Sequence, residues 1–469
     1  MSRYSLPIFL LFSGMTLAQS GGTPAVSARG SQSAAAEVTL EAPQPQQNAG
    51  AQSGTQQSVP LPKPAPGTPQ KRSGTQITLD QAIQLAIDNS PTLKASRTQI
   101  EQNQAQEITA NLRPNPTLSW DTQFVPIFTP SLFSSETLQN LQQFDVGIGY
   151  TFERGQKRQH RLQAARDATA VTEAQVADTV RTLSFNVAQQ FVNVLLAQAN
   201  IDLSQADLDS FQQTVTISQE RYRAGDISEG DLLKIKLQLL QFQTDLSSAQ
   251  VAKLQALASL RVLMGFNAVP HDYDVAGQLT YEPLASKLDD LDAAALRQRA
   301  DLRAAQQGVR AAQSQMALAY ANGKQDLGTE FSYSHVSGFS GSSLFFNIPL
   351  PIFDRNQGEK ARTRYALDQA QFTSQAAEQT VHTDVSSAYD AAQTDEEIVK
   401  LYLSGYLKQA QDSREISEYA YRGGAATLLD LLDAERSYRS TQLGYRQAVA
   451  SYMLALEQLR EAVGSRSLP

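Results

Sequence analysis

Two carboxylates, Asp430 and Asp433, have a type and a spacing that suggest chemistry. Side chains three residues apart on a helix share a face, so two acids there would create a local negative charge that attracts cations. A structural explanation is open for Asp430, because Thr427 three residues before it fits a capping box that secures a helix start. Asp433 lies beyond the capping turn. We therefore expect an acidic surface here, with Asp433 as its clearer member.

Patterns typical of enzymes are missing from the sequence. The chain has no cysteine, which removes thiolate metal ligands and cysteine nucleophiles. It also has no G-x-S-x-G motif and no phosphate-binding glycine loop. Four histidines stand without a partner at metal-site or triad spacing, and we expect them to be solvated residues of helices or loops: His160, His271, His335 and His382. We predict a protein that is not an enzyme, with no catalytic residue, cofactor or metal site.

The two acids belong to a stretch that occurs twice. "YRAGDISEGDLL", beginning at Tyr222, returns as "YRGGAATLLDLL", beginning at Tyr421. Gly225 and Gly424 align, and each supplies the backbone freedom that a chain reversal at the end of a helix requires. The flanking sequence repeats in the same order over roughly 190 residues per copy, a period too long for a solenoid. We conclude that the chain is a duplicated half-molecule whose two helix breaks are equivalent.

The repeat also contains a difference in charge. Asp231 aligns with Asp430, and Ser228 ahead of it again fits a capping box. Lys234, however, stands where the second copy has Asp433. The two turns are therefore expected to share a backbone and to differ in charge.

The composition excludes several classes of protein. The 469-residue chain has a formal net charge of −8 and its Lys and Arg residues are dispersed along the sequence, so we expect no nucleic-acid binding. No stretch beyond the N-terminus reaches the roughly 18 consecutive apolar residues of a transmembrane helix. Because cysteine is absent, we also expect no lipid anchor on an N-terminal cysteine.

The chain divides into a leader region and the two copies. Residues 1–18 hold an apolar run that is too short to span a bilayer and ends in small residues, the pattern of a signal peptide. Residues 19–76 are rich in Gly, Pro, Gln, Ser and Ala, which predicts a disordered leader. The copies, 77–280 and 281–469, are expected to form one interlocked domain.

Long helices dominate each copy. No Gly or Pro lies between Gly155 and Gly225, and one helix of about 69 residues would be roughly 104 Å long. The equivalent stretch, Gly358 to Gly423, contains only Gly405. Two shorter helices, over 92–113 and 231–264, together match the length of the long one. We predict a mainly α fold made of duplicated antiparallel helical hairpins.

Between the helices, four segments alternate with period two. They cover 117–124 and 144–152 in the first copy, and 330–335 and 344–353 in the second. Apolar side chains on one face and small or polar ones on the other, over about nine residues, match outer-membrane barrel strands, although a hairpin on a soluble protein alternates similarly. Four strands cannot close a barrel, and an open edge in lipid leaves backbone groups unpaired. Closure must come from other chains.

The order of these elements resembles the TolC-type outer-membrane efflux proteins. The resemblance covers about residues 77–465. Its most specific segments are "YRGGAATLLDLLDAE" and "PLPIFDRNQGEKARTRYA". The second segment most resembles the heavy-metal and cation efflux branch of the family. The resemblance implies a homotrimer that forms a 12-stranded barrel in the outer membrane of a Gram-negative-type bacterium. It also implies a periplasmic tunnel whose lower end is closed by the helix breaks.

The family's site residues map onto the repeated turns. In the family the second-copy acids face the axis, which would make Asp430 and Asp433 a pore constriction of stacked carboxylate rings. A tyrosine matched by Tyr421 ties the second turn to an acid matched by Asp231. The family's arginine partner falls on Ala426 here, which puts the usual ionic lock in doubt. Two other arginines could substitute for it: Arg422 and Arg223.

The resemblance also implies partners and a function. They are a periplasmic adaptor, also called a membrane fusion protein, an inner-membrane pump and the outer-membrane lipid, and the chain would be the exit duct of this tripartite exporter. An alternative with the same architecture is a duct for type I protein secretion. An alternative of another class is a soluble periplasmic coiled-coil adaptor or scaffold, but such an adaptor has its helical hairpin between halves of a β domain, whereas the order here is reversed.

Overall fold

The computed structural model describes residues 75–123, 128–129, 131, 134–136 and 143–468. The predicted signal peptide and residues 19–74 of the predicted leader lie outside this part of the chain. Gln76, which the sequence assigns to the leader, pairs with Asp274 in a small parallel sheet that was not predicted.

Helices make up most of the described residues. The first copy contains β1 (Gln76–Ile77), α1 (Leu79–Asn89), α2 (Pro91–Ala110), β2 (Thr117–Gln123), β3 (Gln143–Phe152), α4 (Lys157–Ala224), α5 (Glu229–Met264) and β4 (Asp274–Val275). The second copy contains α6 (Leu288–Gln298), α7 (Ala300–Asn322), β5 (Leu327–Val336), β6 (Phe339–Asn347), α8 (Gln357–Leu401), the π-helical segment η2 (Tyr402–Tyr406), α9 (Leu407–Arg422) and α10 (Leu428–Val463). The mainly α fold with a small β part is therefore confirmed.

The local sequence explains where the helices begin and break. Thr78 caps α1 with a complete capping box, and Ser90 caps α2 ahead of Pro91, a residue suited to a first helical turn. The predicted single long helix is α4, with 68 residues. Its equivalent in the second copy is interrupted at Gly405, whose φ of 142° is open to glycine and strained for other residues.

Four strands form one antiparallel sheet in the order β2-β3-β5-β6, so the two copies meet between β3 and β5. One row across the sheet is apolar and exposed: Leu118, Ile148, Phe331 and Leu344. The adjacent row is small: Ser119, Gly147, Ser332 and Ser343. Neighbouring residues of a strand point to opposite faces, so the sheet has one apolar face and one face of small and polar residues, as predicted.

The position predicted for the fourth strand is wrong. The sequence places it over 344–353, but β6 spans Phe339–Asn347. Pro349 and Pro351 have no N–H to donate to a ladder, so pairing ends before them. The apolar residues that follow Asn347 therefore lie in an irregular connection to α8.

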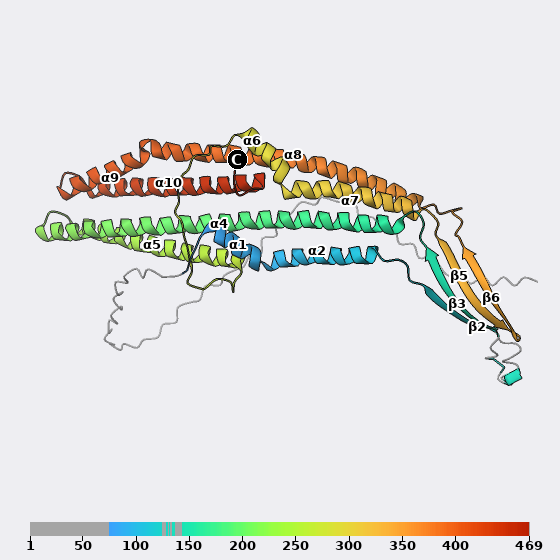
Figure 1. The fold of residues 1–469 in the computed structure, drawn as a ribbon. Coiled ribbons are helices and arrows are strands. Elements are labelled where there is room, and N and C mark those ends of the chain that lie inside the picture. The colour runs from blue at the N-terminus through green and yellow to red at the C-terminus, as the bar shows by residue number, and fades with distance from the viewer. Residues whose placement is uncertain (1–74, 124–127, 130, 132–133, 137–142, 469) are drawn as a thin grey trace, which may run out of the picture. The chain divides into compact units, whose positions relative to one another are not determined.

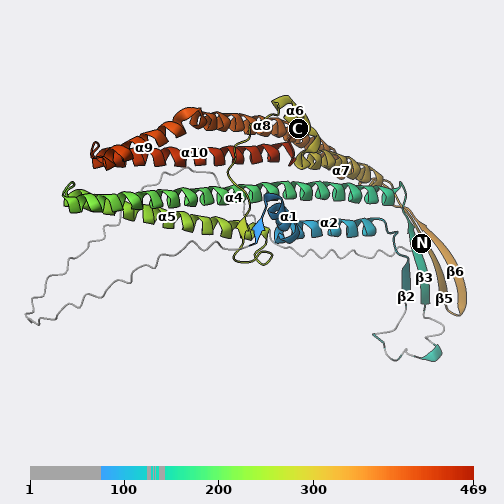
Figure 2. The same cartoon turned by 60° about the vertical axis from the view of Figure 1, so that its left-hand side comes forward.

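The helices lie side by side in the same order as the strands. The long helix α4 packs against α2 and α5 from its own copy and against α7 and α10 from the other, while α8 packs against α7 and α10 (Figures 1 and 2). α2 and α5 thus flank α4 on the side of β2, and α8 and α9 lie on the side of β6. Within the described residues no helix is both long and apolar enough to cross a membrane.

Candidate functional site

The two helix reversals lie next to each other and line a cavity that is open to solvent. The α4–α5 turn and the α9–α10 turn line about 440 Å³ between them. Gly225 has a φ of 84° and Gly424 a φ of 77°, the left-handed conformation that glycine adopts without strain. A buried cluster that includes Phe211, Phe242 and Leu431 packs the ends of α4, α5 and α10 together beside the cavity. The two repeated stretches are therefore brought into one site.

In the first turn, Asp231 is engaged by its own helix. Its backbone N–H donates to Ser228 Oγ at 3.1 Å, and its carboxylate accepts from the same hydroxyl at 2.8 Å. Lys234 Nζ lies 3.4 Å from the carboxylate. The Ser228 hydroxyl, followed by Lys234, holds the pKa of Asp231 below its usual value. The first turn thus carries an acid that a lysine one turn along the helix balances.

In the second turn, Asp430 completes a capping box. The Thr427 N–H donates to the Asp430 carboxylate at 3.0 Å, and the Asp430 N–H donates to Thr427 Oγ1 at 3.3 Å. The Thr427 hydroxyl also donates to the carboxylate, and this bond lowers the pKa of Asp430. Asp430 therefore has the structural role left open by the sequence and keeps its negative charge while performing it.

Asp433 is the acid without a capping role. Its side chain is 59% exposed, and it forms an ion pair of 3.5 Å with Arg436, itself 81% exposed. An exposed pair of this kind contributes little stability and leaves the carboxylate open to solvent ions. The two acids thus differ: Asp430 is tied to the backbone, and Asp433 makes only an exposed ion pair.

Tyr421 is held by α4 in the single chain. It is 3% exposed, and its hydroxyl lies 3.2 Å from Ser218 Oγ, whereas the family resemblance implies a bond to Asp231. Asp231 lines the same cavity but contacts Ser228 and Lys234.

Arg221 is a functional candidate that the sequence did not reveal. Its guanidinium donates to the backbone oxygen of Tyr421 at 2.6 Å and lies 5.0 Å from the centre of the Tyr421 ring. The two arginines considered as substitutes for Ala426 are engaged locally instead, Arg422 with Glu418 and Arg223 with Glu220. Arg221 therefore ties the first-copy helix to the second-copy turn.

Two of the four histidines have a hydrogen-bonding partner: His382 remains 48% exposed, as predicted for a solvated residue, whereas His335 lies in β5 and not in a helix or loop. His382 Nδ1 lies 2.7 Å from Asp292 Oδ1, and His335 Nδ1 lies 3.0 Å from Ser340 Oγ. Both partners come from other elements, α6 and β6, which sequence spacing does not bring together. No group of three or more His, Cys, Asp or Glu side chains suited to a metal ion occurs among the described residues.

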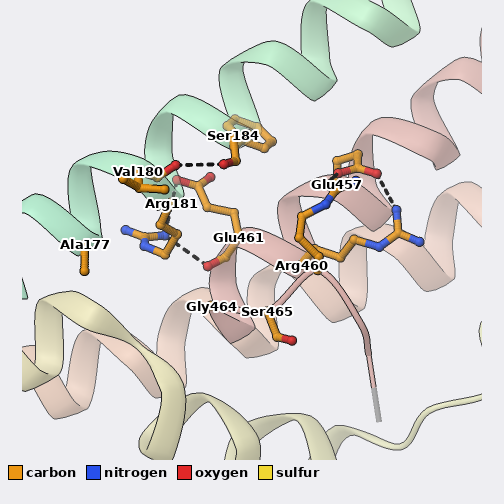
Figure 3. Close-up of a pocket in the computed structure, with 11 residues that line it drawn as sticks. Ala177, Val180, Arg181, Ser184, Glu457, Arg460, Glu461, Gly464 and Ser465 are labelled. Atoms are coloured by element: carbon orange, nitrogen blue, oxygen red, sulfur yellow. Dashed lines mark hydrogen bonds and ion pairs between the residues drawn. The ribbon is translucent and has the colours of Figure 1, made fainter. Parts of the chain in front are cut away.

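A second cavity, of about 210 Å³, lies between α4 and the end of α10 (Figure 3). Arg181 of α4 pairs with Glu461 of α10 at 3.2 Å, and burial raises the pKa of Glu461 although Arg181 opposes the shift. Glu457 pairs with both Arg460 and Arg466. Because the Arg181–Glu461 pair joins the two copies and the neighbouring charges are paired within the second copy, we interpret this cavity as a structural joint.

Comparison with known proteins decides the family. The family model for outer membrane efflux proteins matches residues 82–266 and 292–465, once in each copy. The chain belongs to this family. Its sequence is 27% identical to the cobalt-zinc-cadmium resistance protein CzcC of Cupriavidus metallidurans over 81% of the chain and 88% of that protein. It is 24% identical to the cation efflux system protein CusC of Escherichia coli over 64% of the chain and 68% of that protein.

Solved structures share the fold. The outer membrane protein VceC of Vibrio cholerae superposes with a TM-score of 0.66 at 20% identity, covering 82% of this chain and 96% of that one. A membrane protein from Pseudomonas aeruginosa gives a TM-score of 0.69 at 20% identity, covering 84% and 92%. The resemblance to TolC-type efflux proteins and to their cation efflux branch, first seen in the sequence, is thereby confirmed.

Proposed function

We propose that the chain is the outer-membrane exit duct of a tripartite exporter. An inner-membrane pump would load it through a periplasmic adaptor, and the duct itself performs no chemistry. The observation that carries the proposal is a sheet with an exposed apolar face joined to helical hairpins, one of which contains the 68-residue α4. The sheet has the pattern of a lipid-facing barrel wall, and the hairpins are long enough to continue it as a tunnel through the periplasm.

The order of the elements supports closure by copies of the same chain. The edge strands are β2 and β6, so a head-to-tail ring would pair β2 of one copy with β6 of the next, and three copies would give a 12-stranded barrel. The same ring would bring α5 beside α9 of the neighbour. Exposed apolar side chains occur on both helices, Leu233 and Leu237 on α5 and Ile416 and Tyr419 on α9.

The charged end of the proposed duct is the pair of turns. In a trimer, Asp430 and Asp433 of three chains would place six carboxylates around the axis, which favours cations over anions. The name of CzcC refers to cobalt, zinc and cadmium, and the name of CusC refers to cations. We therefore propose metal cations as the cargo.

Disulfide crosslinking tests the ring. The chain has no cysteine, so the double variant Leu233→Cys, Ile416→Cys introduces the only two thiols. Leu233 lies four residues from the start of α5 and Ile416 six residues from the end of α9, so their heights above the turns, about 6 and 9 Å, are similar. Oxidised membranes should yield a covalent trimer in denaturing gels, whereas either single variant should yield no trimer. A double variant that stays monomeric, or a chain recovered wholly in the soluble fraction, would overturn the proposal.

A further inference from the structure

The four connections between helices and strands meet at one end of the sheet. They lie within residues 110–116, 150–161, 320–328 and 348–364, which we call the collar. The ladder aligns them: Phe152 pairs with Leu327 and Gly328 with Asn347. Figure 1 shows all four passing from α2, α4, α7 and α8 into the strands at the same level.

Side-chain contacts hold the collar together. Lys157 Nζ lies 2.7 Å from Asp326, which joins the first copy to the second. Arg161 donates to the backbone oxygen of Leu112 at 3.3 Å, and Lys360 Nζ lies 5.5 Å from the ring centre of Tyr320. The collar is therefore a packed surface contributed by both copies.

The collar is strongly basic in an acidic protein. Its four segments contain ten Lys and Arg residues against four Asp and Glu, although the chain as a whole has a net charge of −8. Among the described residues, five of these bases are exposed and have no carboxylate within ion-pair distance: Arg113, Arg154, Lys324, Arg355 and Arg364. The sequence prediction that basic residues are dispersed is wrong at this level of the fold, because folding gathers four separate segments.

An exposed apolar segment lies beside these bases. Leu350 is 76% exposed and Phe353 is 90% exposed, in the irregular connection that Pro349 and Pro351 keep out of the sheet. This segment follows directly from β6, whose Leu344 and Phe346 belong to the exposed apolar face. The surface of the sheet is thus apolar, and the surface of the collar, nearer the helices, is both apolar and basic. An apolar surface followed by a mixed apolar and basic one is typical of a protein at the boundary between hydrocarbon and lipid headgroups.

We propose that the collar binds the headgroups of anionic phospholipids where the sheet leaves the bilayer. The exposed guanidinium and ammonium groups contact lipid phosphates, and Leu350 and Phe353 reach among the acyl chains. The inference rests on the proposed function, because it requires the sheet to lie in a membrane. An anionic lipid is preferred to a zwitterionic one, since the choline or ethanolamine cation of the latter offsets its phosphate charge.

The only tryptophan of the chain provides the readout. Trp120 is 74% exposed on β2, three residues from Thr117 at the collar end of that strand. Brominated lipids quench tryptophan fluorescence on contact. Full-length protein in phosphatidylcholine vesicles containing either brominated phosphatidylglycerol or brominated phosphatidylcholine therefore reports which lipid surrounds the sheet.

At low salt we expect the phosphatidylglycerol content of the lipid around the native protein to exceed that of the bulk bilayer by about fivefold or more. A factor of about five is the effect of a single base near an anionic surface. The collar variant Arg113→Gln, Arg154→Gln, Lys324→Gln, Arg355→Gln, Arg364→Gln should lose this preference. A matched set of exposed helical bases should keep it: Lys94→Gln, Arg97→Gln, Lys236→Gln, Arg310→Gln, Lys408→Gln. Raising the salt concentration should weaken the preference of the native protein, which tests the idea without any variant.

The outcomes separate this inference from the proposed function. Quenching of the native protein by both lipids equally, or a preference that survives in the collar variant, would overturn the headgroup site while leaving the membrane position intact. Absence of quenching by either lipid would overturn both.

Discussion

The two helix-reversal turns share a backbone but not a charge pattern. Both place a glycine with positive φ after the incoming helix and a hydroxyl residue at the cap of the outgoing one. At the equivalent position one turn into the outgoing helix, however, the first copy has Lys234, which balances Asp231, and the second has the exposed Asp433. The duplication has therefore preserved the geometry that reverses the chain and altered the charge that ions would meet.

The turns also differ in how they are held. The second turn is fastened by a residue of the first copy, since Arg221 at the end of α4 contacts both the backbone and the ring of Tyr421. Copies that look equivalent in sequence thus have unequal roles: the end of α4 acts as the support, and the α9–α10 turn is the part held against it.

The largest effect is expected from removing this support. Arg221→Ala deletes a cation–π contact and a charged hydrogen bond, together worth about 2 kcal/mol. The second turn should loosen, so the conductance of single channels in planar bilayers should rise. Arg223→Ala, which removes only a surface pair with Glu220, is the control and should leave conductance unchanged. Equal behaviour of the two variants would show that Arg221 does not hold the turn.

A smaller and symmetrical effect is expected at the two glycines. Gly225→Ala and Gly424→Ala should each destabilise the protein by about 1.5 kcal/mol, because alanine is strained at positive φ. Neither new Cβ meets a close neighbour: space is open at Gly225, and the nearest atom at Gly424 is an Arg221 nitrogen at 3.6 Å. Denaturant midpoints should shift equally. A much larger loss at one glycine would mean that the two turns are not equivalent in backbone.

The smallest effect is expected at the caps. Thr427→Ala and Ser228→Ala each remove the same two hydrogen bonds, one accepted from the backbone N–H of the acid three residues on and one donated to its carboxylate. The bond from the Thr427 backbone N–H to Asp430 survives the substitution, so each variant should cost about 1 kcal/mol. Thermal melting followed by circular dichroism should show similar shifts for the two variants, and a much larger loss in one of them would contradict the equivalence of the caps.

Local features of the fold could be predicted from the sequence, and long-range ones could not. The long α4 follows from the absence of Gly and Pro between Gly155 and Gly225, and the starts of α1 and α10 follow from capping boxes whose two residues lie three positions apart. The contact of Arg221 with Tyr421 joins residues 200 positions apart, and the sequence contains no signal for it. The basic collar likewise exists only once four distant segments are folded together. The fourth strand was misplaced because alternation continues past Asn347, although the prolines there cannot join a ladder.

The measurement that tests the account most directly is the ion selectivity of the assembled duct with and without Asp433. Asp433→Asn removes the exposed acid of the second turn and leaves the capping box of Asp430 intact, so the trimer should form normally. In planar bilayers, the account predicts a lower ratio of cation to anion permeability than in the native protein and weaker block by multivalent cations. Lys234→Gln, at the equivalent position of the first turn, is the matched comparison and should have little effect. Unchanged selectivity and block in a correctly assembled Asp433→Asn trimer would contradict the account, because the acid would then be an ordinary solvated residue.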